Sequence, residues 1–468
     1  MAVFMEKISS KSLVNYPFIN QPLEVYELVN GHKIIFVKKE GDLVNVSTWV
    51  KTGSINEDDE INGISHFLEH LMFKGTPAHP AGEFDRILEA KGAIVNAATW
   101  KDYTFYYVTF PKGESNENLQ EVLELHADMM LNPIIPDEEI GASFDLNSPS
   151  VDDKRERHVV IEEIRMRDDQ PWTKTYNELN HHMYKVHPYR RDVIGTAEII
   201  STVSRDTIMN YYKTWYTPEN MTTIVVGEFD VENVLEMLIK GFDFKGFDFN
   251  SMPVAQKHDY IQEELQTEQI YIENKGNIAT AFLMFGFHGP KAKILKDSII
   301  LDALAIILGE GKSSRLKQNL IEKPEFPVFN IIGADQYHFK DGNTFFIQGN
   351  FNPAKKDEAI NQIKDEIQKI IDFPIAESEL EKARKKLKVQ FAESAETVSE
   401  IGELIGYYMT VCDDLSMCSD YLSILENITV NDVQDTAKRY LDLNKATISV
   451  LMPELGIDAT GIGETDDE

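Results

Sequence analysis

Two histidines and a glutamate stand close together early in the sequence, in the order H-x-x-E-H. They are His66, Glu69 and His70. Residues three and four positions apart lie on one face of an α-helix, so both imidazoles and the carboxylate would point to one side. Converging imidazoles are typical Zn²⁺ ligands, and a carboxylate beside them can take a proton from a water that the metal activates. The pattern predicts a hydrolytic zinc site, inverted relative to the H-E-x-x-H helix.

A catalytic zinc usually has three protein ligands, so another acid or imidazole is needed. The charged segment 154–167 predicts a helix with Glu156 and Glu163 two turns apart on the same face as Val159 and Val160. Acids on such an apolar stripe are costly unless they are paired or bind a metal. We therefore expect Glu163 as the third ligand, with one zinc per chain. We expect Glu156 to orient one of the ligands.

Other residues could supply the third ligand. Five histidines are weaker candidates than Glu163: His126, His158, His181, His182 and His187. Glu156 and Glu162 are the alternative acids, although Glu162 lies to the side of the stripe. A fourth protein ligand would indicate a structural zinc site, and we find no candidate for one.

The composition narrows the class of protein. The chain has 468 residues, 42% of them hydrophobic, and a net charge of −32. This charge argues against binding the backbone of nucleic acids and against a polybasic membrane contact, and it is compatible with basic peptides. We find no secretory signal and no apolar run of membrane-spanning length, and therefore expect a cytoplasmic protein. Cys412 and Cys418 are expected to be ordinary thiols.

The order of elements indicates an α+β fold of two homologous domains. The first half contains strands and helices in alternation, and the second half repeats its pattern. Segment 278–285 corresponds to the strand 44–50, and segment 298–308 corresponds to the motif helix without ligand residues. Each domain is expected to hold a mixed, mostly antiparallel sheet with helices packed on one face.

Composition shifts suggest the boundaries of these domains. We expect a zinc-binding domain over 1–240, a linker over 241–266 and a homologous domain without metal over 267–455. The acidic tail 456–468 is expected to be disordered.

The sequence resembles the pitrilysin–insulysin–mitochondrial processing peptidase family of inverted-motif zinc peptidases, as a small two-domain member. The matching stretches are 63–76, 92–99, 156–164, 187–189 and 215–221. The resemblance implies zinc on His66, His70 and Glu163, with Glu69 as general base. It also implies that the chain forms a half-clam facing a partner half across a closed chamber. The strand carrying Asn96 and Ala97 would bind extended peptide by strand addition.

Two features depart from the family pattern. The spacing between His70 and Glu163 is longer than usual, and we place the extra residues in the loop 140–153. Complete members carry an Arg and a Tyr seven positions apart after a glycine-containing loop, which is segment 308–316 here. In this chain those positions fall on Ile321 and Val328, whose side chains cannot donate a hydrogen bond.

We therefore expect a two-chain peptidase that hydrolyses extended or unfolded peptides, with this chain as the metal-bearing subunit. A related subunit without zinc would supply the Arg and Tyr, or the protein would be a homodimer. In a shifted alignment, Arg315 or Tyr337 would do this work instead. The alternative function is a non-catalytic scaffold of the same fold, but the full set of metal-site residues favours an enzyme.

Overall fold

The computed structural model describes residues 6–114, 116–141, 144–147, 153–243, 263–264 and 266–454. Most of the expected linker and the whole expected tail lie outside these residues. The chain forms two compact units. The first unit comprises 1–165, 191–260 and 391–419, and the second comprises 166–190, 261–390 and 420–468.

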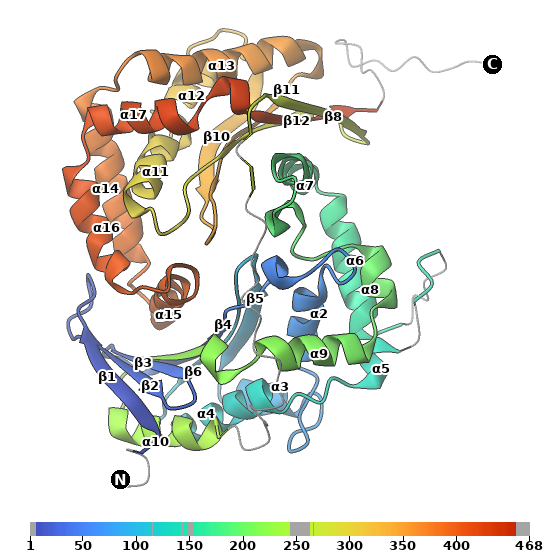
Figure 1. Cartoon of the computed structure of the whole chain (residues 1–468), viewed down its shortest axis with the longest axis vertical. Coiled ribbons are helices and arrows are strands. Elements are labelled where there is room, and N and C mark those ends of the chain that lie inside the picture. Colours follow the sequence, from blue (N-terminus) through green and yellow to red (C-terminus); the bar gives the residue numbers. More distant parts are fainter. Residues whose placement is uncertain are drawn as a thin grey trace. The chain divides into compact units, whose positions relative to one another are not determined.

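The first unit is built on a seven-stranded sheet with the order β1-β2-β3-β7-β4-β6-β5 (Figure 1). Its strands are β1 (Ile8–Val14), β2 (Leu23–Leu28), β3 (Lys33–Lys38), β4 (Leu43–Val50), β5 (Ile94–Thr99), β6 (Thr104–Pro111) and β7 (Met221–Gly227). Its helices are α2 (Ile64–Leu71), α3 (Glu83–Ala90), α4 (Glu117–Leu131), α5 (Asp137–Ile140), α6 (Glu156–Asp168), α8 (Ala197–Thr202), α9 (Arg205–Trp215), α10 (Val231–Gly241) and α15 (Val398–Tyr407).

The second unit is built on a five-stranded sheet with the order β10-β11-β9-β12-β8. Its strands are β8 (Ile270–Gly276), β9 (Ala281–His288), β10 (Phe329–Tyr337), β11 (Thr344–Phe351) and β12 (Thr447–Pro453). Its helices are α7 (Pro171–Met183), α11 (Leu295–Gly309), α12 (Arg315–Lys317), α13 (Lys356–Asp372), α14 (Glu377–Glu393), α16 (Ser416–Asn427) and α17 (Val430–Tyr440). In the described part of the chain, no helix combines the length and apolar character that crossing a membrane requires.

The two sheets share one pairing scheme. β3 pairs in parallel with β7, and β4, β6 and β5 follow in antiparallel order. In the second sheet β8 pairs in parallel with β12, and β9, β11 and β10 follow in antiparallel order. The expected α+β fold, with two related and mostly antiparallel sheets, is confirmed. The strand β9 corresponds to β4, as the repeat predicts.

The two faces of β4 carry different side chains. Val44 and Val46 face the main core of the first unit. Because side chains alternate along a strand, Trp49 points to the opposite face. There α15 packs so closely that a Cβ added at Gly406 would lie 1.9 Å from the indole of Trp49. Helices were expected on one face of the sheet only, and α15 covers the other face as well.

Two helices belong to the unit opposite to the one expected from their place in the sequence. α7 lies within the predicted first domain, but its Leu179 packs against Met284 and Phe346 of the second sheet. α15 lies within the predicted second domain, but it packs on β4 and β7 of the first sheet. The apolar surface against which each helix can pack decides the unit to which it belongs. Its position along the chain does not.

A buried chain of hydrogen bonds crosses the first sheet. Nε2 of His32 lies 3.0 Å from the hydroxyl of Thr223, which lies 2.9 Å from the hydroxyl of Thr48. The hydroxyl of Thr48 lies 2.9 Å from Nε2 of His126 on α4. Burial lowers the pKa of both histidines to about 3, so both are neutral in the folded protein.

Candidate metal centre

The buried carboxylate of Glu57 caps the start of the motif helix α2. Oε1 of Glu57 accepts hydrogen bonds from the backbone N–H and the hydroxyl of Ser65, at 2.8 and 2.5 Å. Oε2 accepts from the backbone N–H of Gly63 and the amide of Asn62, both at 2.8 Å. Glu57 therefore satisfies the free N–H groups at the start of the helix and places negative charge at its positive end.

Glycine is required at the start of α2 for two reasons. Gly63 has a φ of +97°, which L side chains rarely adopt. A Cβ at Gly63 would also lie 2.5 Å from the carbonyl oxygen of Ile194 and 2.9 Å from the Cα of Gly195. This close backbone contact fixes where α2 starts and, with it, the position of His66.

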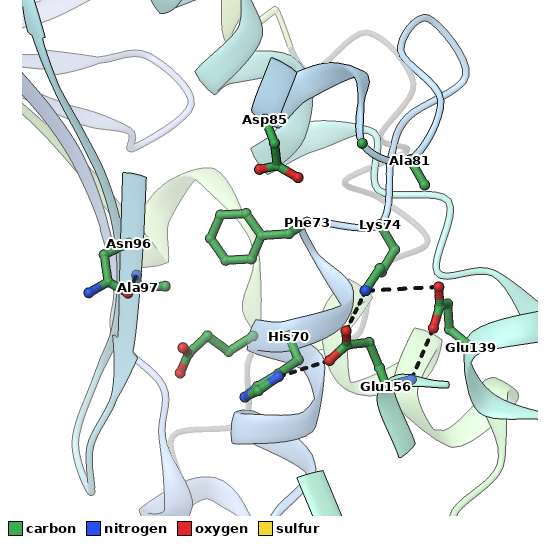
Figure 2. A pocket seen from close by; sticks show the side chains of 11 residues that line it. His70, Phe73, Lys74, Ala81, Asp85, Asn96, Ala97, Glu139 and Glu156 are labelled. Carbon is green, nitrogen blue, oxygen red and sulfur yellow. Dashed lines mark hydrogen bonds and ion pairs between the residues drawn. The ribbon is translucent and has the colours of Figure 1, made fainter. Parts of the chain in front are cut away.

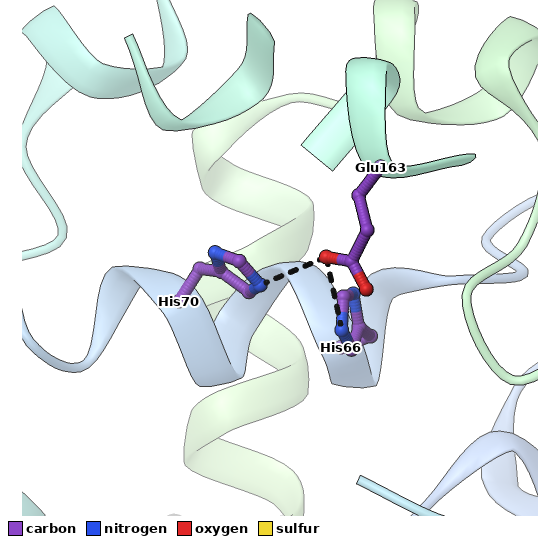
Figure 3. Close-up of side chains that lie close together, drawn as sticks. All are labelled: His66, His70 and Glu163. Atoms are coloured by element: carbon purple, nitrogen blue, oxygen red, sulfur yellow. Dashed lines mark ion pairs between the residues drawn. The ribbon is translucent and has the colours of Figure 1, made fainter. Parts of the chain in front are cut away.

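Three side chains from two helices converge at the candidate metal centre (Figure 3). His66 and His70 extend from α2, and Glu163 reaches them from α6. Oε2 of Glu163 lies 3.8 Å from Nε2 of His66 and 3.6 Å from Nε2 of His70. Two ligands of one tetrahedral zinc lie about 3.3–3.6 Å apart. One ligand atom from each of the three residues lies within 4.8 Å of the other two. The spacing and chemistry of this set therefore fit a zinc ion.

His70 is oriented by a second acid. Its Nδ1 donates to Oε2 of Glu156 at 3.0 Å, which directs Nε2 toward Glu163. Glu156 in turn pairs with Lys74 at the end of the motif. Burial lowers the pKa of His70, but its interactions with Glu156 and Glu163 outweigh burial and raise this pKa to about 9. The surroundings of His70 therefore stabilise a positive charge. A metal ion would compete with the proton for binding to its imidazole.

Glu69 lies beside this set and is held separately from it. Only 9% of Glu69 is exposed, and the hydroxyl of Thr99 on β5 donates to its Oε2. Burial raises the pKa of Glu69, and the hydrogen bond from Thr99 opposes that shift. A carboxylate with a raised pKa next to a metal site is suited to accept and return a proton.

The strand β5 lies next to this centre. It is the last strand in the order of its sheet and pairs with β6 on one side only, so its other edge is open as far as the described residues show. Asn96 is exposed on this strand and Ala97 is half-buried. Oδ1 of Asn96 accepts a hydrogen bond from the N–H of Ala97 at 2.9 Å. Both residues line a cavity that also contains Glu69 and His70.

The rival ligands lie outside this set, although Glu156 contacts one of its members. Among the described residues, His66, His70 and Glu163 form the one cluster of metal-ligating groups. Glu162 is 48% exposed and pairs with Arg165, consistent with the expected solvated position. His126 is bonded to Thr48, and the remaining rival histidines lie outside the cluster as well.

The positions expected to lack hydrogen-bond donors are both apolar and packed. Val328 is 2% exposed in the second core, and Ile321 packs against that core from a short turn of π-helix at Gln318–Glu322. Arg315 donates two hydrogen bonds to Glu379, at 2.8 and 2.7 Å.

Tyr337 belongs to an aromatic cluster with Tyr176 and Phe346, at ring separations of 5.2 and 5.0 Å. Both residues of the shifted alignment, Arg315 and Tyr337, thus have structural roles in the second unit.

Three contributors to the site were missed at the level of sequence. Thr99 holds Glu69, Lys74 holds Glu156, and Glu57 caps α2. Lys74 and Thr99 stand inside stretches that carry the family resemblance, which is the signal that could have pointed to them. Glu57 lies nine positions before His66 in a polar segment with no helical periodicity.

Two imidazoles on one helix, a carboxylate ligand from a second helix and a separate buried acid are the side-chain set of a mononuclear zinc hydrolase. Comparisons with known proteins agree. The family description "Insulinase (Peptidase family M16)" matches residues 33–197, and "Peptidase M16 inactive domain" matches residues 202–387. The chain belongs to the M16 peptidase family.

Relatives and solved structures extend this assignment. The chain is 29% identical over 435 residues to a zinc protease named PqqE from Helicobacter pylori, covering 92% of this chain and 93% of that protein. A crystal structure of a protease from Helicobacter pylori matches with a TM-score of 0.81 and 29% identity, covering 92% of this chain and 99% of that one. A Pseudomonas fluorescens structure described as a peptidase M16 inactive domain matches with a TM-score of 0.80 and 16% identity, covering 93% and 99%, which shows the fold alone.

Proposed function

We propose that this chain is a zinc endopeptidase that hydrolyses extended or unfolded peptides and carries the metal of a two-chain enzyme. One observation carries the proposal. His66, His70 and Glu163 converge from two helices while Glu69 stays outside the ligand set, held by Thr99. A structural zinc site has no need for such a separately held acid.

Each residue has a defined part in the proposed reaction. Zinc held by His66, His70 and Glu163 would supply Lewis acidity toward a peptide carbonyl and toward water. Glu69 accepts a proton from the attacking water and returns it to the leaving amine. Glu156 keeps the Nε2 atom of His70 directed into the site.

The substrate is proposed to bind along β5. The open edge of this strand offers backbone N–H and C=O groups to an extended peptide, which would add a strand to the sheet. This mode requires an unfolded segment, because a folded substrate has already paired its own backbone groups. This binding mode is supported by Asn96 and Ala97, which line the same cavity as Glu69 and His70.

A partner chain is proposed because of Ile321 and Val328. Hydrolysis of an amide produces negative charge on the carbonyl oxygen, and donors that stabilise this charge contribute strongly to the rate. Ile321 and Val328 are packed apolar side chains that cannot serve. A related subunit without zinc would provide the missing groups, whereas a homodimer would need donors other than the residues at these two positions.

Metal analysis combined with a peptide-cleavage assay tests the proposal. Purified protein should contain about one zinc per chain. Its cleavage of an unfolded peptide should rise when a co-encoded homologue is added. Glu69→Gln should keep its zinc but lose hydrolysis in the same mixture. Full activity of this chain without the homologue would contradict the heterodimer, and cleavage by Glu69→Gln would contradict the general base.

A non-catalytic scaffold is the second candidate. It is favoured by the match of residues 202–387 to the domain described as inactive and by the apolar side chains of Ile321 and Val328. A scaffold would bind its partner. It would hydrolyse no peptide even when each chain holds one zinc ion. The same assay therefore separates the two functions.

A further inference from the structure

Lys101 lies in the turn between β5 and β6, directly after the strand that passes the candidate metal centre. Figure 2 shows this strand, with Asn96 and Ala97, beside His70 of α2. Only 3% of Lys101 is exposed, although its side chain ends in an amine that is normally charged. Burying a charge is costly, and lysine is almost never fully buried unless it is paired. The position of Lys101 therefore calls for a role beyond packing.

The amine of Lys101 lies among charged groups. Its Nζ donates to the carbonyl oxygen of Arg191 at 2.8 Å. Burial lowers the pKa of Lys101 to about 8, and the guanidinium of Arg191 adds to this shift. Attraction by three carboxylates opposes the shift, and these belong to Asp192, Asp102 and Glu57. Because burial outweighs this attraction, Lys101 can lose its proton in mildly alkaline solution.

The turn that contains Lys101 is connected to the proposed general base. It is closed by a hydrogen bond from the N–H of Trp100 to the carbonyl oxygen of Tyr103, at 2.8 Å. It begins directly after Thr99, whose hydroxyl donates to Glu69. A shift of the turn would therefore move the hydroxyl that holds Glu69.

The same turn supports the segment that leads into α2. The N–H of Ser54 donates to the carbonyl oxygen of Trp100 at 3.3 Å, and the N–H of Ile55 donates to that of Lys101 at 2.9 Å. A Cβ added at Gly53 would lie 2.1 Å from the carbonyl oxygen of Trp100. The turn and this segment are thus in direct backbone contact.

A third segment, which contains Arg191, completes the arrangement. Nη1 of Arg191 donates to the carbonyl oxygen of Glu57 at 2.8 Å. The side-chain amide of Asn62 donates to the carbonyl oxygen of Asp192 at 2.8 Å. Lys101 thus joins the end of β5 to the two segments that fix the start of α2.

We propose that Lys101 is a positioning residue for the general base, and that its positive charge keeps Thr99 and α2 where they hold Glu69. The inference rests on the proposed peptidase function. A charged ammonium attracts the carboxylates around it, whereas a neutral amine does not. Deprotonation of Lys101 therefore loosens the turn, and hydrolysis declines above about pH 8.

The buried charge has the opposite effect on stability. The ordinary pKa of a lysine is 10.5. Between about pH 8 and pH 10, the unfolded chain therefore binds a proton at Lys101 that the folded chain does not bind. Relative to Lys101→Met, the folding equilibrium constant of the wild type should rise about tenfold per pH unit in this range. A decline of hydrolysis over the same range would thus not be a result of alkaline unfolding caused by Lys101.

Two variants and one control test the proposal. Lys101→Met removes the charge and keeps most of the apolar stem, and Lys101→Arg keeps the charge to higher pH. Lys112→Met is the matched control, because Lys112 follows the other end of β6 and pairs with Glu228. Melting temperature and zinc content establish that each variant is folded and holds its metal.

The first readout is the pH dependence of kcat, measured on the zinc-loaded enzyme with its partner. The wild type should lose kcat above about pH 8, and Lys101→Arg should retain it to higher pH. At neutral pH, Lys101→Met should have a kcat about tenfold or more below that of the wild type, because small displacements of a catalytic group are costly. Lys112→Met should follow the wild type throughout.

The second readout does not depend on hydrolysis. Fluorine NMR of the zinc-loaded protein, labelled with fluorotryptophan, reports on Trp100 next to Lys101. The resonance is assigned by its absence in Trp100→Phe. It should shift with a midpoint near pH 8 in the wild type and show no such shift in Lys101→Met.

The two readouts separate this proposal from the proposed function. A Trp100 resonance that titrates near pH 8, with no hydrolysis at any pH, would remove the peptidase function and leave the charge-dependent turn standing. Hydrolysis with a Trp100 resonance that does not titrate would overturn the role of Lys101. Wild-type kcat in Lys101→Met, or the same alkaline decline in both proteins, would overturn it as well.

Discussion

Nδ1 of His70 donates a hydrogen bond to Oε2 of Glu156 at 3.0 Å, although 86 positions separate the two residues in the sequence. The bond fixes which imidazole nitrogen faces the metal centre. It also links α2 to α6, the helix that carries Glu163. The orientation of one ligand and the placement of another therefore depend on the same contact.

Replacing Glu156 by alanine should weaken zinc binding by about 10–100-fold, because an imidazole that loses its supporting acceptor is neither oriented nor as basic. Competition with a chelator of known affinity measures this. Glu162→Ala is the matched control, since Glu162 is an exposed acid on the same helix and pairs with Arg165. Equal zinc affinity in both variants would show that Glu156 does not support the site.

Replacing Thr99 by valine should lower kcat by about 10–100-fold while zinc content stays unchanged. Valine keeps the shape of the side chain but removes the hydroxyl that donates to Glu69, and one such hydrogen bond to a charged group contributes about 1.5–3 kcal/mol. Steady-state kinetics of the partnered enzyme and metal analysis provide the two measurements. A variant with wild-type kcat would mean that Glu69 is positioned by other contacts.

Replacing Glu57 by alanine should reduce the free energy of unfolding by roughly 2–4 kcal/mol, because buried donors at the start of α2 would lose their acceptor. Zinc affinity should fall as well, since His66 stands on the first turn of that helix. Denaturant unfolding with and without zinc gives both quantities. Glu60→Ala, three positions away, is the control because Glu60 is exposed; a loss of similar size there would refute the capping role.

The stability of the fold should decline below about pH 6.5 because of His32 and His126. Both have folded pKa values of about 3 against an ordinary value of 6.5. Below pH 6.5, the unfolded chain therefore binds protons at these two histidines that the folded chain does not bind. This contribution to stability is complete above pH 6.5 and is lost as pH falls toward 3, at about 1.4 kcal/mol per pH unit for each histidine.

A substitution isolates that effect from the titration of carboxylates. His126→Gln keeps a polar contact to Thr48 without a titrating group. Between pH 7 and pH 5, its free energy of unfolding should fall by about 2 kcal/mol less than that of the wild type. Parallel pH dependences for the two proteins would mean that His126 is protonated in the folded state.

Replacing Gly406 by alanine should destabilise the first unit by about 1–3 kcal/mol, the usual cost of overpacking a core. The added Cβ would lie 1.9 Å from the indole of Trp49, so α15 would have to move off the sheet. Thermal unfolding monitors the loss. Gly333→Ala is a suitable control, because a Cβ there would meet its nearest atom at 3.9 Å. Equal melting temperatures would show that α15 tolerates displacement.

The sequence by itself determined the features that depend on local spacing. The interval between His66, Glu69 and His70 is set by helical geometry, so their common face could be predicted before any fold was known. The same holds for Glu156 and Glu163, two turns apart on α6. The strand patterns also predicted the repeat. The parallel pair in each sheet, β3 with β7 and β8 with β12, agrees with that prediction.

Only the tertiary structure decided the contacts between distant segments. Thr99 reaches Glu69 because β5 lies beside α2, and Asp85 of α3 lines the same cavity as Phe73. No periodicity along the chain encodes these distances.

The exchange of α7 and α15 between the two units has the same origin. Each is an ordinary amphipathic helix in sequence, and apolar burial has no preference for neighbours in the chain. In the sequence, Gly406 is only a residue of low helix propensity. Glycine is needed there because of the indole of Trp49, which lies on a strand that is distant in the sequence. The pattern of residues thus specified which groups could perform chemistry, and the packing within each unit specified which of them meet.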